Sequence, residues 1–225
     1  MKKYEFTGET KQVGLFGNIT LKRIRATMEF GIIKIGDLGG WIEKEENLSH
    51  KGDAWVYGNA EVYGNAKVWG NAKVCGNAKV WGNAKVYGNA EVYGNAKVWG
   101  NAKVCGNAKV WGNAKVCGNA NVYGNAKVYG NAKVWGNAKV YGNAEVFSIS
   151  HVLVIGPIGS RNDFTTFFRD KDSKITVKCG CFLGKIDKFL EKVSKTHGDS
   201  KYAIVYRTAA EIAKQQIDLS EEKQV

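Results

Sequence analysis

The chain contains little proline, little histidine and no long apolar run, and each scarcity excludes a class of protein. Its 225 residues include one proline and three histidines. A membrane-spanning helix needs roughly 18 or more consecutive apolar residues, and the sequence has no such run. The start Met1-Lys2-Lys3 leads into a polar segment and not into the apolar core of a signal peptide. We therefore expect a protein without membrane contact, in the cytoplasm of the cell that makes it.

What the sequence has in abundance is one six-residue phrase, Gly-Asn-Ala-Lys-Val-aromatic. It recurs sixteen times without an insertion between residues 52 and 147. A Gly-Asn pair in almost every unit excludes a helix, because it would place helix breakers throughout. Ala and Val are two residues apart, so they point to the same side of a short strand. Gly and Asn supply the bend, since both tolerate positive φ.

A short strand and a fixed bend, repeated without change, predict a parallel β-solenoid. Small Ala and β-branched Val are expected to fill a narrow interior, while stacked Asn side chains form ladders at the corners. The phrase resembles the hexapeptide-repeat family of left-handed β-helices, in which a small residue follows an aliphatic one four positions later, as Ala60 follows Val56. The resemblance implies a left-handed helix, three hexapeptides per coil and about five coils. The expected fold class is mainly β.

With three units per coil, every eighteenth residue lies on the same face. One face then carries an uninterrupted lysine row beside a tryptophan-rich column: Lys79, Lys97, Lys115 and Lys133, with Trp81, Trp99 and Trp135. The stacked lysines repel one another, and a nucleic acid or other polyanion bound along the row would relieve this repulsion. The indole rings beside the row could stack on its bases or sugars. The alternatives are a face that joins chains into a homo-oligomer, and a solvated scaffold surface.

The charge distribution fits more than one of these interpretations. The formal net charge is +12, and residues 51–147 hold 12 Lys or Arg against 4 Asp or Glu. Such a surface attracts nucleic acid, anionic polysaccharide or acidic lipid. Lysine also keeps a regular β surface soluble, so the charge by itself does not identify a ligand.

The five cysteines lack the spacing of a disulfide framework and agree with a reducing compartment. Three of them replace aromatic residues on three different faces of the solenoid: Cys75, Cys105 and Cys117. Cys179 and Cys181 form a Cys-x-Cys pair without a second pair, which is weak evidence for zinc even if His151 or His197 lies near. We therefore expect no metal and no cofactor.

The segments on either side of the repeat have other compositions. Residues 1–51 are predicted to form a β cap over the first turn, with the coil beginning near residue 42 and Leu48 in the alanine column. Residues 148–225 are predicted to form an α+β module of about three strands and two helices, the first helix including Leu183. This module either shields the last turn or folds independently.

A Gly-rich loop in the C-terminal module is the second candidate site. Gly156–Ser160 follows an apolar strand and is interpreted as a hairpin turn, with an anion-binding loop as the alternative. That alternative predicts a small-ligand site, or a catalytic one, built from Ser160, Arg161, Arg169, Cys179 and Cys181.

An acyltransferase is disfavoured, although many hexapeptide-repeat proteins are acyltransferases and some are zinc-dependent carbonic anhydrases. The resemblance implies that the transferases need a histidine base near an inserted loop and that the anhydrases need three histidines. Residues 52–147 contain neither a histidine nor an insertion. We therefore expect a protein that is not an enzyme.

Phrases outside the regular repeat resemble a group of uncharacterised phage and prophage proteins, the YdcK-like proteins among them. These phrases are Arg23–Ala26, Gly36–Glu43, Glu46–Ser49, Ile155–Arg161 and Cys179–Phe182. The resemblance implies a phage or prophage product in bacterial cytoplasm. We expect a scaffold that spaces or oligomerises a C-terminal binding module, whose partner could be a bacterial host protein. Polyanion binding by the lysine row and small-anion binding in the module are the alternatives.

Overall fold

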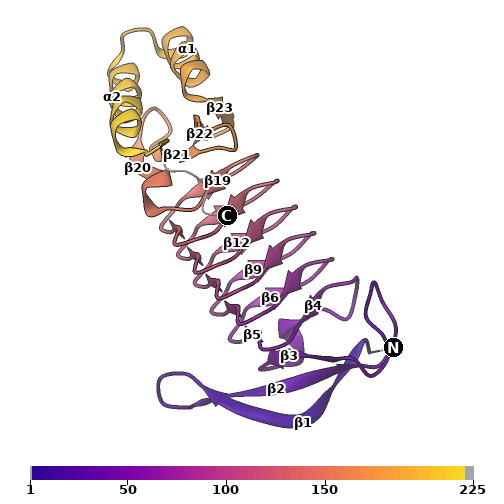
Figure 1. Ribbon diagram of the computed structural model, residues 1–225. Helices are drawn as coiled ribbons and strands as arrows, with labels where there is room; N and C mark the ends of the chain where they lie inside the picture. The colour runs from indigo at the N-terminus through magenta and orange to yellow at the C-terminus, as the bar shows by residue number, and fades with distance from the viewer. Residues whose placement is uncertain (1, 221–225) are drawn as a thin grey trace.

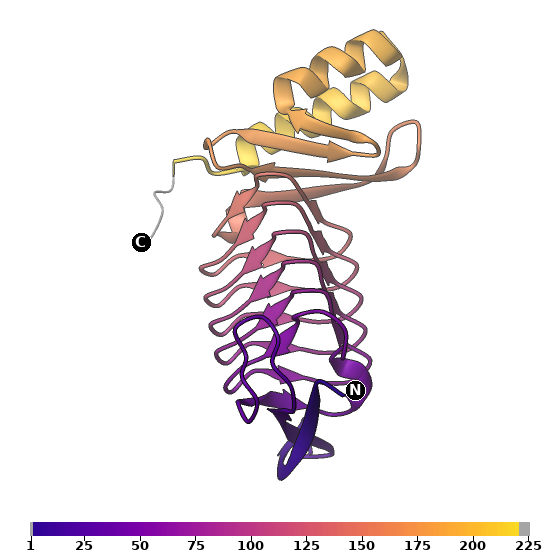
Figure 2. The ribbon, with the colours of Figure 1, turned by 90° about the vertical axis from the view of Figure 1, so that its right-hand side faces the viewer.

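The computed structural model describes residues 2–220, which form an elongated rod (Figures 1 and 2). A cap of long strands lies at one end, stacked solenoid turns follow, and a module with two helices lies at the other end. Met1 of the predicted cap and residues 221–225 of the predicted module lie outside the described residues. Among the described residues, no helix is both long enough and apolar enough to cross a membrane.

The N-terminal cap is a small antiparallel sheet that continues into the solenoid. β1 (Tyr4–Val13) pairs with β2 (Ile19–Ala26), and β2 pairs with β3 (Leu38–Ile42). The other edge of β3 pairs in parallel with β5 (Glu61–Val62), so the cap sheet becomes one face of the solenoid. The short 3-10 helix η1 (Glu45–Asn47) follows β3.

Every copy of the repeat contributes one two-residue strand. The other strands are β4 (Trp55–Val56), β6 (Lys67–Val68), β7 (Lys73–Val74), β8 (Lys79–Val80), β9 (Lys85–Val86), β10 (Glu91–Val92), β11 (Lys97–Val98), β12 (Lys103–Val104), β13 (Lys109–Val110), β14 (Lys115–Val116), β15 (Asn121–Val122), β16 (Lys127–Val128), β17 (Lys133–Val134), β18 (Lys139–Val140) and β19 (Glu145–Val146). Each pairs in parallel with the strand three units further on, as Val92 pairs with Val110. Three hexapeptides therefore make one turn, as the resemblance implied.

The solenoid has about six turns, one more than expected, because an irregular segment builds the first. Ile42 pairs with Val62 and Leu48 bridges to Val68, so both occupy the valine column. The expectation that Leu48 lies in the alanine column is wrong. Val56 follows Leu48 at a spacing two residues longer than the repeat, and this insertion shifts the phase. The inserted His50 leaves the column and stacks on Tyr4, with ring centroids 4.4 Å apart.

Within each unit, Ala and Val fill the interior, and Gly and Asn form the corner. Every repeat Ala and Val is at most 1% exposed, and nothing larger than Val is needed to fill the regular turns. At the corners only the glycines take positive φ, between 56° and 79°. The asparagines instead form the predicted ladders; for example, Asn71 Nδ2 donates to Asn89 Oδ1 at 3.0 Å, and the same step recurs on all three corners.

The C-terminal module has four antiparallel strands in sequence order, followed by two helices. They are β20 (Val152–Ile158), β21 (Asp163–Arg169), β22 (Ile175–Cys179), β23 (Phe182–Lys185), α1 (Ile186–His197) and α2 (Lys201–Gln216), with the 3-10 helix η2 (Ile149–His151) before them. The fourth strand was not predicted. Leu183 lies in β23 and not in the first helix, because a tight turn at Gly180 folds the segment back onto β22.

The module sheet lies between the last solenoid turn and the two helices. Phe168 joins the solenoid core, whereas its neighbour Phe167 packs into the separate core beneath the helices. At the junction, the Lys139 amide donates to Thr166 Oγ1 at 3.0 Å. The module therefore covers the edge that the last turn would otherwise expose, which is one of its two predicted roles.

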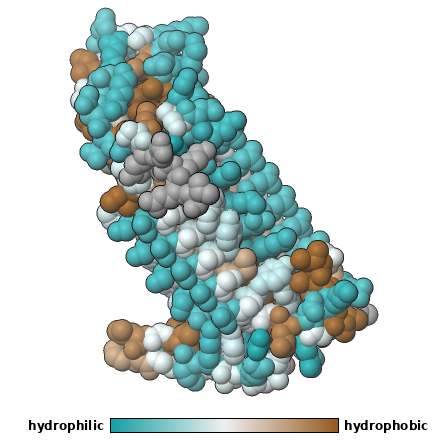
Figure 3. Space-filling view, viewed as in Figure 1, coloured by the Kyte–Doolittle hydropathy of each residue, from teal (hydrophilic) through white to brown (hydrophobic). Residues whose placement is uncertain are grey.

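The space-filling view separates a polar solenoid flank from apolar patches on the cap (Figure 3). The cap exposes five large apolar side chains: Leu15 (89%), Phe16 (86%), Ile32 (77%), Ile35 (67%) and Leu38 (49%). Leu15 and Phe16 form the tip of the β1–β2 hairpin. Apolar patches of this kind mark contact surfaces more often than the isolated exposed residue does.

Candidate ligand-binding sites

The lysine row exists as an in-register column on one solenoid sheet. Its members start neighbouring strands and lie directly opposite one another: Lys79, Lys97, Lys115 and Lys133. Glu61 is next in the column and lies 2.9 Å from Lys79 Nζ, which neutralises the lower end. Within the described residues, the other three lysines form no ion pair with an acidic side chain. The unbalanced charge is therefore concentrated on the upper part of the row.

The aromatic column beside the lysines is stacked but incomplete. The rings of Trp81 and Trp99 are 5.0 Å apart and nearly parallel, and Tyr63 stacks below Trp81 at 5.8 Å. Stacked rings cover one another's faces. Cys117 interrupts the column, and Trp135 above it is 69% exposed. The stack of rings is therefore broken at Cys117.

The other two faces carry similar aromatic stacks, so stacking does not by itself distinguish the lysine face. Trp69 stacks on Tyr87 and Trp111 on Tyr129, each pair at 4.3 Å. The three solenoid cysteines follow strands of three different sheets, as the sequence predicts: Cys75, Cys105 and Cys117. They cannot pair with one another within the chain.

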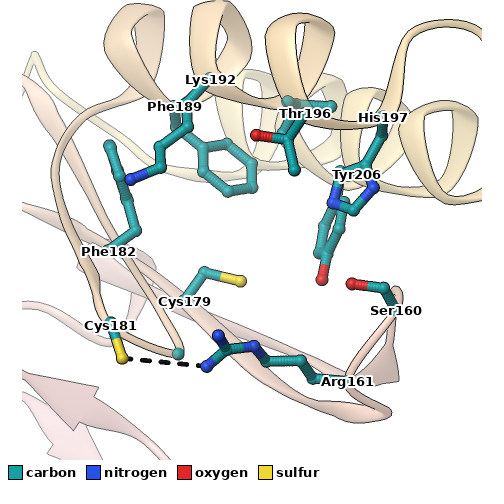
Figure 4. A pocket seen from close by; sticks show the side chains of 12 residues that line it. Ser160, Arg161, Cys179, Cys181, Phe182, Phe189, Lys192, Thr196, His197 and Tyr206 are labelled. Carbon is teal, nitrogen blue, oxygen red and sulfur yellow. Dashed lines mark hydrogen bonds between the residues drawn. The ribbon is translucent and has the colours of Figure 1, made fainter.

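A cavity of about 260 Å³ in the C-terminal module brings together four of the five predicted residues (Figure 4). Ser160 and Arg161 lie in the turn between β20 and β21, while Cys179 ends β22 and Cys181 lies in the turn between β22 and β23. In an antiparallel meander, every second turn lies at the same end of the strands, so the β20–β21 and β22–β23 turns lie at one end of this sheet. The topology thus places the two motifs side by side, although they are far apart in sequence.

The fifth predicted residue, Arg169, lies outside this cavity, so the five do not form one site. Arg169 ends β21, whereas Arg161 precedes its start, and seven residues of strand separate the two by roughly 20 Å. Arg169 is 2% exposed at the junction with the solenoid. Its guanidinium lies 4.8 Å from the centre of the Phe147 ring and donates to Ser173 Oγ at 2.6 Å.

The helices supply the lining that sequence reasoning missed. These residues are Phe189, Lys192, Val193, Thr196 and His197 of α1 and Tyr206 of α2, with Phe182 of β23 below them. The α1 members recur at spacings of three and four, so they share one face of that helix. The apolar members of this face were detectable as core positions. Its polar members Lys192 and Thr196 gave no signal in the sequence, whereas His197 was considered only as a neighbour of the Cys179–Cys181 pair.

Two glycines make room for the site. Gly159 has φ +71°, and a Cβ there would lie 2.0 Å from the Tyr206 hydroxyl oxygen, so the phenol ring packs directly on this turn. Gly180 has φ +52°, and its Cβ would lie 3.1 Å from Arg161 Nη1. Any other residue at these positions would displace a side chain of the lining as well as strain the backbone.

Hydroxyl groups surround one of the thiols. Thr165 Oγ1 donates to Cys179 Sγ at 3.3 Å. Burial, reinforced by the Cys179 sulfur, raises the pKa of the Tyr206 phenol, whose ring packs on the Gly159 turn. Tyr206 therefore stays protonated and able to donate in neutral solution.

The lining is cationic. Arg161 and Lys192 carry the charge, and among the described residues 2–220 no Asp or Glu lines the cavity. Arg161 Nη1 donates to Cys181 Sγ at 3.8 Å, and Lys192 Nζ lies 5.8 Å from the centre of the Phe182 ring. Phe182, Phe189 and Val193 form apolar walls, and Ser160, Thr196 and His197 add uncharged or weakly basic polar groups. The arrangement suits a small ligand with an anionic group and an apolar or planar body.

A metal centre has no donor set in the part of the chain that the structure describes. Within residues 2–220, no group of three or more His, Cys, Asp or Glu side chains is arranged to hold a metal ion. The Cys179–Cys181 pair and His197 line the same cavity, yet they do not form such a group.

Comparison with known proteins gives one short similarity. No family model matches the chain. A segment of 62 residues is 32% identical to the "uncharacterized acetyltransferase YdcK" of Escherichia coli strain K12. The match covers 25% of this chain and 19% of that relative, so the chain spans less than a fifth of the relative's length. Together with the solenoid, it supports a hexapeptide-repeat β-helix.

Proposed function

We propose that this chain is a β-solenoid scaffold that presents a C-terminal module, and that the module binds a small anionic ligand. The cavity carries the proposal: Arg161 and Lys192 face it from two different elements, without an acidic side chain in its lining. Unbalanced cations beside aromatic walls are favourable for an anion, which replaces water around both charges. The rigid turns of the solenoid would hold this module at a fixed distance from the cap.

Ligand pairs that differ in charge but little in shape test this proposal. Benzoate against benzamide, and adenosine monophosphate against adenosine, separate the anionic group from the body of the ligand. We expect the anion of at least one pair to bind more tightly by calorimetry. Arg161→Ala should weaken that binding about tenfold or more, since a charge-assisted hydrogen bond contributes roughly 1.5–3 kcal/mol.

Lys192→Ala and Lys195→Ala form a matched pair of variants for this test. Both residues lie on α1, but only Lys192 lines the cavity. Lys192→Ala should weaken binding and Lys195→Ala should leave it unchanged. Equal affinity for the charged and uncharged members of both pairs, or equal effects of the two lysine variants, would contradict the proposal.

A second candidate function is polyanion binding along the lysine row. The in-register lysines without acidic partners on the upper part of the row support it, as does the exposed Trp135. Binding of single-stranded nucleic acid should weaken steeply with salt, because each neutralised phosphate releases a counterion. Lys97→Gln with Lys115→Gln should reduce both affinity and salt dependence. The pair Lys85→Gln and Lys103→Gln on another sheet is the matched control.

Self-association into a homo-oligomer is a third property that we propose for the scaffold. The apolar cap tip at Leu15 and Phe16 and the exposed Trp135 support it. Association through apolar surfaces should persist or strengthen as salt rises, opposite to polyanion binding. Light scattering of the purified chain at low and high salt distinguishes the two, and a monomer under all conditions would contradict self-association.

Finer features of the scaffold also remain proposals. We propose a left-handed solenoid, on the strength of the hexapeptide resemblance, and a phage or prophage origin with action in bacterial cytoplasm, on the strength of the phrases around residues 23–49 and 155–182. We further propose that the chain is not an enzyme, since its regular turns contain no histidine. A bacterial host protein that carries the anionic group is a possible partner.

A further inference from the structure

Cys181 stands apart from the other cysteines in its accessibility. It is the only exposed one of the five, and it lies in the two-residue turn between β22 and β23. Gly180 before it has positive φ, which such a turn requires of its first central residue. Cys181 is therefore an exposed residue in the lining of the cavity.

The other four thiols are less able to react. Cys105 is buried, and burial raises the pKa of the Cys75 and Cys117 thiols, which disfavours the reactive thiolate. Cys179 is half-buried beneath Thr165 and Tyr206. Reagents from solution should therefore reach Cys181 first.

The charge beside Cys181 selects the kind of reagent. Arg161 Nη1 donates to its sulfur at 3.8 Å, and Lys192 lines the same cavity. These cations raise the local concentration of anions near the sulfur and repel cations. A ligand anchored by its anionic group, with its body against Phe182, would hold a reactive atom close to Cys181.

We infer that Cys181 is a thiolation site for small anionic disulfides. The Cys181 thiolate attacks one sulfur of the disulfide, the sulfur–sulfur bond breaks, and the other half leaves as a thiolate that takes a proton from water. The product is a mixed disulfide whose anionic half occupies the cavity; the small disulfide is the oxidant. This inference rests on the proposed anion site and names one chemical class that would use it.

Competing disulfides of opposite charge test the inference on the full chain. The probes are dithiobis(nitrobenzoate), which is dianionic, and cystamine, which is dicationic. The rate at which each probe thiolates the protein is divided by its rate with mercaptoethanol, which corrects for the different reactivity of the two disulfides. Mass spectrometry of the intact protein and its peptides locates the product. We expect Cys181 to react first and the normalised anion-to-cation ratio to be about ten or more. The ratio should fall about tenfold in 0.5 M salt or in Arg161→Met with Lys192→Met.

Control variants make each outcome decisive. Lys195→Met should keep the ratio, and Cys181→Ser should lose the fast reaction while Cys117→Ser, on the solenoid and outside the cavity, retains it. A fast reaction that survives in Cys181→Ser, or a ratio unaffected by salt and by the Arg161 and Lys192 changes, overturns the inference. Calorimetry on the native chain separates this inference from the proposed function. If the native chain binds the anion but shows no charge preference in thiolation, the inference fails and the proposed function stands.

Discussion

A corner glycine that lies between two regular turns of the solenoid meets two separate requirements. Gly94 has φ +67°, a conformation that L side chains rarely adopt. It also stacks on the next turn so closely that a Cβ would lie 3.0 Å from the Gly112 nitrogen. The asparagine next to each glycine has a different role. Its side chain forms the ladder between turns, but its backbone does not take positive φ.

Alanine substitutions can separate these two requirements. Gly94→Ala should lower the free energy of unfolding by more than the roughly 1–2 kcal/mol that a left-handed backbone costs, because the clash adds to it. Gly58→Ala meets nothing within 4 Å at φ +56° and should lose only the backbone part. Urea denaturation followed by circular dichroism measures both. Equal losses would show that the stacking contact contributes nothing.

A single carboxylate organises the β21–β22 turn. Asp170 is 3% exposed and accepts hydrogen bonds from the Asp172 and Lys174 amides and from Thr176 Oγ1, and it pairs with Lys185. Burial alone would raise its pKa, but these partners outweigh burial and hold the pKa below its usual value. Its stabilising effect is therefore present above the ordinary pKa of about 4 and lost as pH falls through the lower folded value.

Asp170→Asn should therefore destabilise the module in a pH-dependent way. At pH 7 we expect a loss of about 1–3 kcal/mol, because buried donors lose a charged acceptor. The difference from the native chain should shrink in strong acid. Thermal unfolding from pH 7 down to pH 2 measures it. The matched control is Asp172→Asn, whose side chain is 55% exposed and should change stability little. A constant difference across the pH range would exclude ionisation of Asp170 as the cause.

Sequence reasoning succeeded where one element repeats and failed where elements from distant segments meet. Identical Ala-Val units made the solenoid and its asparagine ladders predictable, since every copy has the same neighbours. Leu48 was assigned to the wrong column because the prediction extended the six-residue period backwards, whereas two extra residues separate Leu48 from Val56. The cavity was only half predicted: its two turns carry recognisable phrases, but Lys192 and Tyr206 join them through helix packing that leaves no local pattern. Arg169 was included by chemistry alone and lies at the other end of β21.

At the scale of the whole rod, stability should depend on phase and not on length. Deletion of residues 94–111 removes one complete turn and leaves every remaining column aligned, so the variant should fold with a similar spectrum and be shorter by about 4.8 Å. Deletion of residues 94–96 removes half a unit and places polar side chains toward the interior. It should unfold at a markedly lower temperature or aggregate. Small-angle scattering and thermal denaturation would contradict this if both deletions behaved alike.

The sameness of the units has a consequence for how such a protein changes over generations. A gene built of near-identical hexamers gains or loses copies by slippage during replication, and each unit is accommodated by the same Ala-Val interior. One added unit would advance the module by about 1.6 Å and rotate it by a third of a turn. Only three orientations are therefore open to the module, and every third addition restores the original one. Copy number would set how far, and in which direction, the cavity is held from the cap.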